Sequence, residues 1–465
     1  MKQYISILIL LCITAAATAR DIDCRPGGLA LCGDISSDTE LRLTGGIDVA
    51  DFFHIAGNAP ALKRLDLSGC TIAAYEGDPI DGITRSAANT IPQGVFAASA
   101  IEEIIFPTGQ ALIISDGAFM ASALRKVELP DADVSIGTGA FAACPYLTEV
   151  TVRGRTSVGA YAFRSCPSLA SASLAEAVSI GEMAFASCKA LKKAEFGAGL
   201  TEIGRSAFEN TSLSEASLGA TKITSVADRT FAGNSVLKSV SLPSGVATLG
   251  KGCFADCRSL RDFTVPSTCS LLPDYALKDT GLTTIELGNI CEMGDFALKG
   301  ADNLRHVAMP AHIEYIGNGA MEGMTGLKVI NISDTRSVPQ LGEDVWAGVD
   351  APEVTLIVRS DMTESFGNAD QWKEFRILDQ ALSSTGIIET GGEISIKAVA
   401  AGLLISSTGS DIAAVEIYNA SGVLLAHHRP AAATYTADLT GDTTSVYIIR
   451  ISLADGTAQS FKIVR

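Results

Sequence analysis

The chain has 465 residues, of which 47% are hydrophobic and 19% are charged, and its formal net charge at pH 7 is −17. This composition excludes an intrinsically disordered chain, because it holds enough apolar residues to form a core. The acidic balance disfavours nucleic-acid partners, whose phosphates require a basic surface.

The first residues have the pattern of a secretory signal peptide. A basic start precedes an apolar run from Tyr4 to Ala17, and Ala17-Thr18-Ala19 is a small-x-small cleavage site. We therefore predict a leader over residues 1–19 and export of the chain that follows. The run is too short to cross a bilayer, and no second apolar stretch of about 20 residues follows. We expect no transmembrane helix after the leader.

One sequence pattern repeats about every 22 or 23 residues. The stretch Lys126–Val152 shows it clearly, with a short apolar alternation followed by Ile-Gly, Ala-Phe, Cys and Leu. A period of this length with Leu at fixed offsets predicts a leucine-rich solenoid. The aromatic position recurs along the chain and is later taken by other large apolar residues: Phe96, Phe119, Phe141, Phe163, Phe185, Phe208, Phe231, Phe254, Leu277, Leu298, Met321 and Trp346.

Each repeat contains the segments of one solenoid coil. The template L-x-x-φ-x-L, where φ is apolar or small, alternates inward and outward residues and predicts a short strand. Pro or Gly then ends the strand, a second extended piece ends in Ile-Gly, and we expect Ala-Phe to lie on a helical turn. The predicted fold class is therefore α/β but mostly β, a leucine-rich repeat solenoid of stacked parallel strands. An insertion near Glu76–Thr90 is expected to loop out.

Two outward positions of the predicted strands carry charge. At the third template position the sign alternates where charge is present, which favours stacked neighbours. The second position is mostly basic, with Glu102 as the exception. The candidate binding residues from these two columns are Arg125, Lys126, Lys192, Lys193, Lys238, Arg261, Arg305 and Lys328.

This basic line has two interpretations that the sequence leaves open. The first is a solvated face whose charges also deter edge pairing. The second is a contact line for an acidic protein or a polyanionic glycan.

The pattern LxxVxLPxxVxxIGxxAFxxCxxL resembles the BspA-like leucine-rich repeat family of bacterial surface proteins. The resemblance runs from about Leu62 to Leu378, and it is specific because Ile-Gly, Ala-Phe, Cys and Leu-Pro recur in order. The stretch Leu356–Leu378, with Trp372 and Phe375, resembles the element that caps the last repeat in that family. Some later repeats lack the Phe, and the first hundred residues are irregular. The resemblance implies an extracellular binding or adhesion surface, but no chemistry and no transferable binding residue.

The C-terminal segment follows a different pattern. Gly and Ser residues over 379–392 indicate a linker. Alternating segments at Ala414–His428 and Ser445–Arg465 predict a small antiparallel β-sandwich over residues 393–465. The V-x-I-Y-N-x-x-G block and the K-I-V-R ending resemble the C-terminal sorting domain of the type IX secretion system, although Ser445 stands where that family usually has Gly. A plain structural sandwich is the alternative.

The cysteines suggest core packing and one possible disulfide. Cys24 and Cys32 lie together near the start of the exported chain, where a disulfide between them would close an N-terminal cap. Four others share one repeat position, which we interpret as a small buried core residue, with a metal or disulfide ladder as the alternative: Cys144, Cys166, Cys188 and Cys257.

Patterns of catalytic or cofactor chemistry are missing from the sequence. The five His residues fit no metal motif, and neither a P-loop nor G-x-S-x-G occurs. Gly137-x-Gly139 belongs to the repeat and is not a dinucleotide fingerprint. We therefore predict a protein that is not an enzyme, binds no cofactor and is a monomer.

The predicted organisation has five parts. They are a signal peptide (1–19), a cap with irregular first repeats (20–95), a capped solenoid (96–378), a linker (379–392) and a sorting-domain-like sandwich (393–465). We expect a secreted or cell-surface protein that binds a protein or glycan of a host or neighbouring cell through its exposed strand face. The alternative is a non-catalytic scaffold of a surface nutrient-capture or envelope assembly.

Overall fold

The computed structural model describes residues 19–380, 387–391, 394–399, 402–419, 424–438 and 446–464. Most of the predicted signal peptide and part of the predicted linker lie outside these residues. The chain divides into two compact units. The first comprises Met1–Arg305, Ile313–Leu327 and Gln340–Val349, and the second comprises His306–His312, Lys328–Pro339 and Asp350–Arg465.

The first unit begins with a parallel sheet in the order β1-β2-β3-β7. The insertion predicted near Glu76–Thr90 forms an antiparallel hairpin, and β3 pairs directly with β7 across it. A ten-residue helix, α1, starts with a capping box in which Asp48 and Asp51 accept backbone N–H bonds, and the sequence analysis missed this helix. The elements are β1 (Ala19–Cys24), η1 (Leu29–Leu31), β2 (Glu40–Ile47), α1 (Val49–Asn58), β3 (Arg64–Ile72), β4 (Tyr75–Ile80), β5 (Ile83–Ser86) and β7 (Glu103–Ile105).

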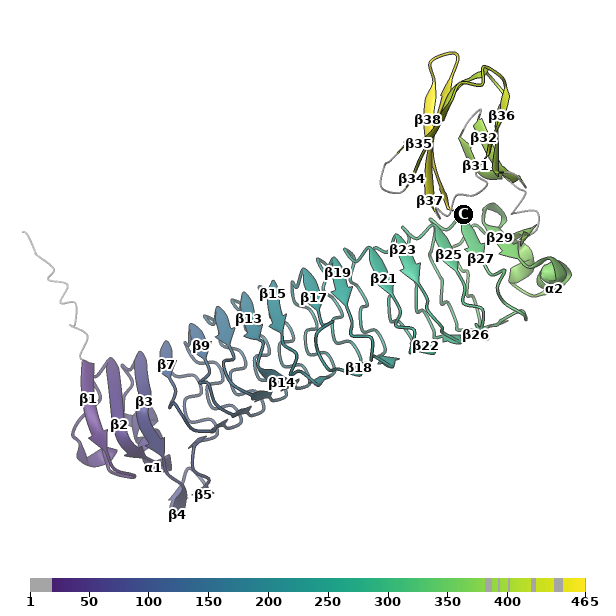
Figure 1. Ribbon diagram of the computed structural model, residues 1–465. Helices are drawn as coiled ribbons and strands as arrows, with labels where there is room; N and C mark the ends of the chain where they lie inside the picture. Colours follow the sequence, from purple (N-terminus) through teal and green to yellow (C-terminus); the bar gives the residue numbers. More distant parts are fainter. Residues whose placement is uncertain are drawn as a thin grey trace, which may run out of the picture. The chain divides into compact units, whose positions relative to one another are not determined.

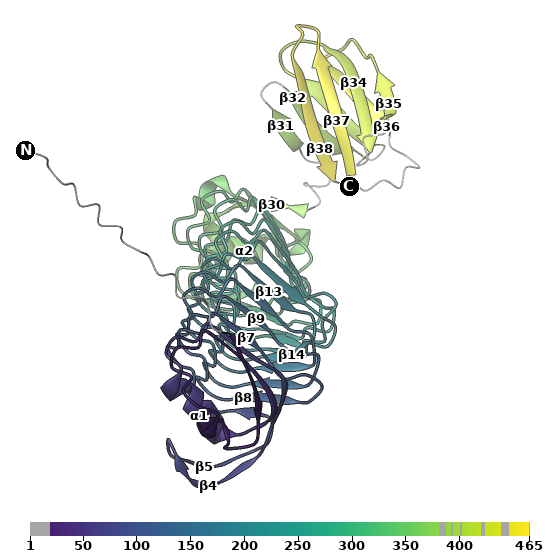
Figure 2. The same ribbon diagram turned by 90° about the vertical axis from the view of Figure 1, so that its left-hand side faces the viewer.

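Each following repeat contributes one strand to each of two sides of the coil (Figures 1 and 2). We call the outward side of the first set, from β7 to β23, the strand face. Its strands are β9 (Lys126–Glu128), β11 (Glu149–Thr151), β13 (Ser171–Leu174), β15 (Lys193–Phe196), β17 (Glu215–Ser217), β19 (Ser239–Ser241), β21 (Asp262–Thr264) and β23 (Thr284–Glu286). The parallel register places residues of equal repeat position side by side, as in Lys126 beside Glu149.

The second set of strands comes from the Ile-Gly segments. Its members are β6 (Thr90–Ile91), β8 (Leu112–Ile114), β10 (Val134–Ile136), β12 (Thr156–Val158), β14 (Ala177–Ile180), β16 (Glu202–Ile203), β18 (Ser225–Val226), β20 (Thr248–Leu249), β22 (Leu271–Leu272), β24 (Glu292–Met293), β26 (Tyr315–Ile316) and β28 (Gln340–Leu341). The predicted class, a mostly β solenoid of stacked parallel strands, is confirmed.

The aromatic column forms the centre of the core. Phe119, Phe141 and Phe163 are fully buried, and their rings stack nearly parallel with centroids 5.2 and 5.1 Å apart. The stack runs from Phe96 to Phe254, and Leu277, Leu298 and Met321 continue the buried position. The sequence predicted this column correctly because its period equals one coil.

The glycine that follows most strands of the second set, often after Ile or Val, lies where two coils approach closely. A Cβ on Gly181 would lie 2.6 Å from the backbone nitrogen of Ala160, and one on Gly159 would lie 2.3 Å from the carbonyl oxygen of Ile136. Contacts this short with backbone atoms leave no room for a side chain. The Ile-Gly pair therefore sets the distance between coils.

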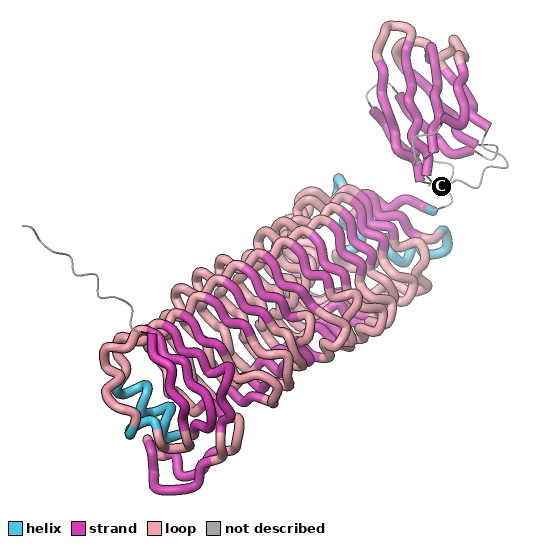
Figure 3. The backbone as a smooth tube through the Cα atoms, turned by 60° about the vertical axis from the view of Figure 1, so that its left-hand side comes forward, coloured by secondary structure: helices cyan, strands magenta, loops and turns pink. Residues whose placement is uncertain are grey.

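The Ala-Phe segment corrects one expectation, because it is a turn and not a helical turn (Figure 3). The residues two before and two after each Phe have positive φ, as at Gly139 (60°) and Ala143 (57°). This left-handed backbone breaks a helix. It directs alternate N–H groups to the next coil, as in the 2.8 Å bond from Phe141 N to Ala162 O. The turns thus form a third hydrogen-bonded ladder.

The positive φ of Ala143 leads to a stability prediction. The left-handed region costs a residue with a Cβ about 1 kcal/mol or more of conformational free energy, whereas it costs Gly little. We expect Ala143→Gly to stabilise the first unit by up to about 1 kcal/mol in urea unfolding. Ala142→Gly, one residue away at a position without positive φ, serves as the control and should not stabilise; equal effects of both changes would contradict the assignment.

The second unit contains a parallel sheet in the order β25-β27-β29-β30 and the predicted cap. Trp372 and Phe375 are buried, and the ring of Trp372 packs edge-on against Phe366 at 5.4 Å. The elements are β25 (His306–Ala308), β27 (Val329–Asn331), η2 (Ala351–Glu353), β29 (Thr355–Val358), η3 (Ser360–Met362), α2 (Thr363–Asn368), η4 (Trp372–Glu374) and β30 (Arg376–Asp379).

The C-terminal part of the second unit consists of two antiparallel four-stranded sheets, β31-β32-β33-β36 and β35-β34-β37-β38. Their shared core includes Ile405, Ile417 and Tyr447. The predicted antiparallel sandwich is confirmed, although β31 occupies residues that we assigned to the linker. The strands are β31 (Ile387–Gly391), β32 (Ile394–Val399), β33 (Gly402–Ser407), β34 (Ile412–Asn419), β35 (Leu424–His428), β36 (Thr434–Asp438), β37 (Val446–Leu453) and β38 (Ala458–Val464).

Candidate functional site

All eight predicted basic residues are exposed, seven of them in the first unit and Lys328 in the second. In the N-terminal part of the face, three of them are neutralised by neighbours. Arg125 lies 2.8 Å from Glu102, Lys126 lies 2.6 Å from Glu128 and 3.3 Å from Glu149, and Lys193 lies 2.5 Å from Glu195. The ion pair with Arg125 lowers the pKa of Glu102. The pairs of Arg125 with Glu102 and of Lys126 with Glu149 join neighbouring coils, whereas Lys193 pairs within its own strand, and none of the three cations forms a free positive patch.

Four of the predicted cations in the first unit have no ion-pair partner within the described residues: Lys192, Lys238, Arg261 and Arg305. Arg261 instead donates a 2.7 Å hydrogen bond to the carbonyl oxygen of Gly281. Lys328 also lacks an ion pair there, but it belongs to the second unit. The structure therefore divides the predicted line into a paired and an unpaired set, which the sequence could not do.

The sheet of the strand face is interrupted between β19 and β21. Strands β17 and β19 pair, and strands β21 and β23 pair, but no backbone hydrogen bond joins β19 to β21 in the described structure. At each of the other two interruptions of this face one main-chain contact remains, from Arg125 N to Glu102 O at 3.0 Å and a long one from Ser214 N to Lys192 O at 3.5 Å. The β19–β21 interruption is therefore a true gap in the ladder.

Two departures from the repeat explain the gap. Phe263 occupies the inward position that is Val127, Val150 or Ala172 in other repeats, and its ring packs 5.1 Å from that of Phe254. Pro273 replaces the Gly of the Ile-Gly pair. Because Pro has no N–H, the bond that Gly294 N donates to Leu272 O has no counterpart here. Accordingly, β20 and β22 are also unpaired in the second set of strands.

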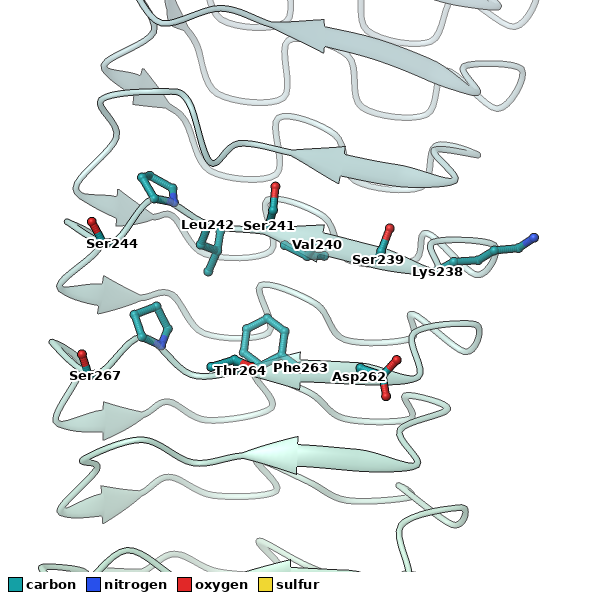
Figure 4. Close-up of a pocket in the computed structure, with 12 residues that line it drawn as sticks. Lys238, Ser239, Val240, Ser241, Leu242, Ser244, Asp262, Phe263, Thr264 and Ser267 are labelled. Carbon is teal, nitrogen blue, oxygen red and sulfur yellow. The ribbon is translucent and has the colours of Figure 1, made fainter. Parts of the chain in front are cut away.

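The gap opens as a groove of about 500 Å³ on the strand face (Figure 4). Val240 and Leu242 are half-buried there, whereas the residue equivalent to Leu242 in the preceding repeat, Leu218, is fully buried. Lys238 lies at one end of the groove and extends away from β19. The remaining lining is mostly polar or turn-forming: Ser239, Ser241, Pro243, Ser244, Asp262, Phe263, Thr264, Pro266 and Ser267.

A second basic hollow lies over the other set of strands. Arg155 and Lys222 line a groove of about 580 Å³ together with Glu176, and neither cation has an ion pair in the part of the chain that is described. These residues fall outside the L-x-x-φ-x-L template and were not among the predicted binding residues. The strand ladder is also interrupted beside this hollow, between β16 and β18, but Lys222 N still donates a 2.8 Å bond to Leu200 O there.

The repeated cysteines are buried free thiols, as we interpreted them. Their role goes beyond packing. Cys144 Sγ donates to Phe119 O at 3.2 Å, Cys188 Sγ donates to Phe163 O at 3.0 Å, and Asn234 at the equivalent position donates to Phe208 O at 2.8 Å. The column satisfies carbonyl groups inside the coil. Among the described residues, no three His, Cys, Asp or Glu side chains are placed to hold a metal ion.

Cys24 and Cys32, the possible disulfide of the sequence, are free thiols in the structure. Each thiol faces nearby backbone, Cys24 the carbonyl of Ile22 and Cys32 that of Gly28. Hydrogen bonds to Asp51 hold the loop between them. The buried carboxylate of Asp51 accepts bonds of 2.9 and 2.8 Å from the backbone N–H groups of Gly27 and Leu29.

These burial differences predict a labelling pattern. Burial raises the pKa of Cys257 to about 12 and that of Cys24 to about 11, so neither forms thiolate at pH 8. We expect the half-buried Cys32 and Cys291 to react first with a maleimide in the native protein, as located by mass spectrometry. Labelling in urea is the control, and early modification of Cys257 in native protein would contradict the structure.

The stacked parallel coils, the buried Leu and Phe columns and the charged strand face together define a leucine-rich repeat protein. The family model of the BspA type leucine rich repeat region matches this chain in six copies over residues 89–179, 112–236, 156–283 and 224–351. Because these matches span more than half of the chain, it belongs to that family. No curated protein matches the chain.

Several solved structures are similar to this chain. A leucine-rich repeat protein from Bacteroides ovatus is 18% identical, with a TM-score of 0.52, and the match covers 74% of this chain and 86% of that one. The pneumococcal vaccine antigen PcpA is 16% identical, with a TM-score of 0.34, over 78% of this chain and 84% of that one. A leucine rich cell surface protein from Faecalibacterium prausnitzii is 16% identical, with a TM-score of 0.27, over 50% and 82%. The first of these supports the solenoid fold.

Within the described residues, none of the helices has the length and apolar character needed to span a bilayer.

Proposed function

We propose that this protein is a secreted or cell-surface binding protein that holds an acidic macromolecule on its strand face. The observation that carries the proposal is the interrupted sheet at β19–β21, where a groove lies beside the unpaired cation Lys238. Solenoids of stacked repeats present extended surfaces of this kind for binding. Membership of the BspA type family and the signal-like start of the sequence support an extracellular location.

The unpaired cations Lys192, Lys238, Arg261 and Arg305 are expected to supply most of the binding energy. The paired cations Arg125, Lys126 and Lys193 already interact with carboxylates of neighbouring or same strands, so a ligand would have to displace an existing ion pair. A free ammonium or guanidinium group gives a larger gain to an incoming anionic ligand.

The C-terminal sandwich has a separate proposed role. Its resemblance to the type IX sorting domain supports a function in export, which does not involve the strand face. The test is secretion: a chain truncated after Asp379 should accumulate inside the cell, and export of the truncated chain would overturn this role.

The binding proposal is tested with a panel of matrix proteins, mucin and sulfated glycans at low and high salt. A variant with Lys192, Lys238, Arg261 and Arg305 all changed to Glu should lose at least about tenfold in affinity. The matched control changes Arg125, Lys126 and Lys193 to Glu and should lose less. Absence of saturable binding by the native protein, together with co-purification with envelope proteins of its own cell, would favour the scaffold alternative and overturn the proposal.

A further inference from the structure

We propose that the gap between β19 and β21 binds an extended acidic polypeptide segment by main-chain hydrogen bonding, with its carboxylates near Lys238 and Arg261. This inference rests on the proposed function and names the class of its ligand. It is carried by three features of the groove: unpaired backbone groups on both walls, a joint that can widen, and an excess of positive charge at one end.

The backbone groups follow from the parallel register. In intact coils the residue that ends the strand template donates its N–H to the next coil, as Leu218 does to Ser241 O at 2.9 Å and Val265 to Glu286 O at 2.8 Å. Leu242 is the equivalent residue of β19, and its N–H has no acceptor in the described structure. Because a parallel strand directs alternate residues to the same edge, Val240 on β19 and Asp262 and Thr264 on β21 also direct N–H and C=O groups into the gap.

Such groups are complementary to an extended chain and to few other ligands. Half-buried N–H and C=O groups require partners, and a strand supplies both kinds at the matching spacing. Full insertion requires β19 and β21 to stand two strand spacings apart, which is about 9.6 Å. Binding must therefore widen the gap.

The joint between these two coils is built to allow widening. Neither the β19–β21 nor the β20–β22 ladder exists, so no strand hydrogen bond has to break. The two coils are held together by the turn ladder, with bonds of 2.9, 3.0 and 2.8 Å donated by Gly252, Phe254 and Asp256. Thr268 and Cys269 also donate to the carbonyl of Val246. A small rotation about the turns would therefore move β19 and β21 apart on the strand face.

The charge of the groove favours an acidic segment over a neutral one. Lys238 has no anionic partner in the described residues, and Arg261 bonds only a neutral carbonyl. Asp262 is the one acid in the lining; it accepts a 2.6 Å bond from the Thr284 hydroxyl and keeps its negative charge, so two cations stand against one carboxylate here. A glycan fits less well, because the one aromatic ring in the lining, Phe263, is buried and offers no stacking surface.

The experiment titrates the full protein with three probes. They are a peptide of about ten residues that alternates Val or Thr with Glu, the same peptide with Lys in place of Glu, and a sulfated glycan. Affinity is measured by calorimetry, and amide hydrogen exchange is followed at Leu242 and Leu218. We expect only the acidic peptide to bind with slowed exchange at Leu242, because only a strand supplies an acceptor for that N–H.

Two pairs of variants locate the binding. Ser241→Trp fills the groove from an exposed position on β19 and should weaken peptide binding at least about tenfold. Ser217→Trp makes the same change at the equivalent position of β17, away from the groove, and should not weaken binding. The double change Phe263→Val with Pro273→Gly restores the repeat residues. It should close the ladder, slow exchange at Leu242 in the free protein and abolish peptide binding.

The outcomes separate this inference from the proposed function. Glycan binding that is lost in the four-cation variant, with no peptide binding, would overturn the inference and leave the proposed function standing. Peptide binding without a change at Leu242, or equal effects of Ser241→Trp and Ser217→Trp, would also overturn it. Failure of every probe and every panel member would overturn both.

Discussion

Replacing Gly181 with Ala is expected to destabilise the first unit by about 3 kcal/mol. The new Cβ would lie 2.6 Å from Ala160 N and 2.7 Å from the carbonyl carbon of Gly159, distances that side chains do not adopt. Both contacts are with backbone, so relief requires two coils to separate and their ladder bonds to lengthen. Urea unfolding followed by circular dichroism measures the loss.

The control for this prediction is Gly245→Ala. Gly245 lies in an exposed turn of the same solenoid, where an added Cβ would meet no atom within 4 Å. We expect the free energy of unfolding of this variant to remain within about 0.5 kcal/mol of that of the native protein. If Gly181→Ala were equally harmless, the spacing between coils would not depend on the glycine.

The second large effect is expected at the aromatic column. Phe185 is fully buried between Phe163 and Phe208, with ring centroids 5.1 and 5.2 Å away. Phe185→Ala removes a large apolar side chain and leaves a cavity, which costs about 3–5 kcal/mol. Both neighbouring rings also lose a stacking partner.

Phe185→Leu provides the graded comparison, because the chain itself uses Leu at this position in Leu277 and Leu298. We expect a loss of roughly 1.5 kcal/mol or less, since most of the volume is kept. Similar losses for Ala and Leu would show that the position depends on ring stacking and not on filled volume. Tryptic cleavage sites mapped by mass spectrometry would reveal whether the damage stays local, as expected for a repeat array.

Sequence periodicity was enough to predict the coil, because each core column recurs once per repeat. Phe141, Ile136 and Leu129 could be assigned to the core from their spacing alone, and all are buried. The prediction of a helical turn after Ile-Gly was wrong. A residue such as Ala143, which is not Gly, gives no sign in the sequence that its φ is positive. Helix α1 was missed, although Asp48 and Asp51 formed a capping pattern before an apolar stretch.

The candidate site was only partly predictable. The basic column was visible, but which cations are neutralised depends on side-chain directions, such as Lys126 reaching both Glu128 and Glu149. The gap had a sequence signal that we did not use: Phe263 at a position of aliphatic residues, followed by Pro273 where most repeats have Gly. Departures from a repeat mark the places where its regular hydrogen bonding stops, and the groove is one of them.

The measurement that tests this account most directly is native-state hydrogen exchange of individual amides in the free protein. We predict that the Leu242 amide exchanges much faster than the Leu218 and Val265 amides, which lie at the same repeat position and donate to the next coil. The Arg261 amide should likewise exchange much faster than the Thr283 amide, which lies at the same repeat position as Arg261 and donates to the carbonyl oxygen of Arg261 in the preceding coil at 2.7 Å. Equal protection within each of these comparisons would show that the sheet is continuous across β19 and β21, and it would remove the basis of the proposed binding site.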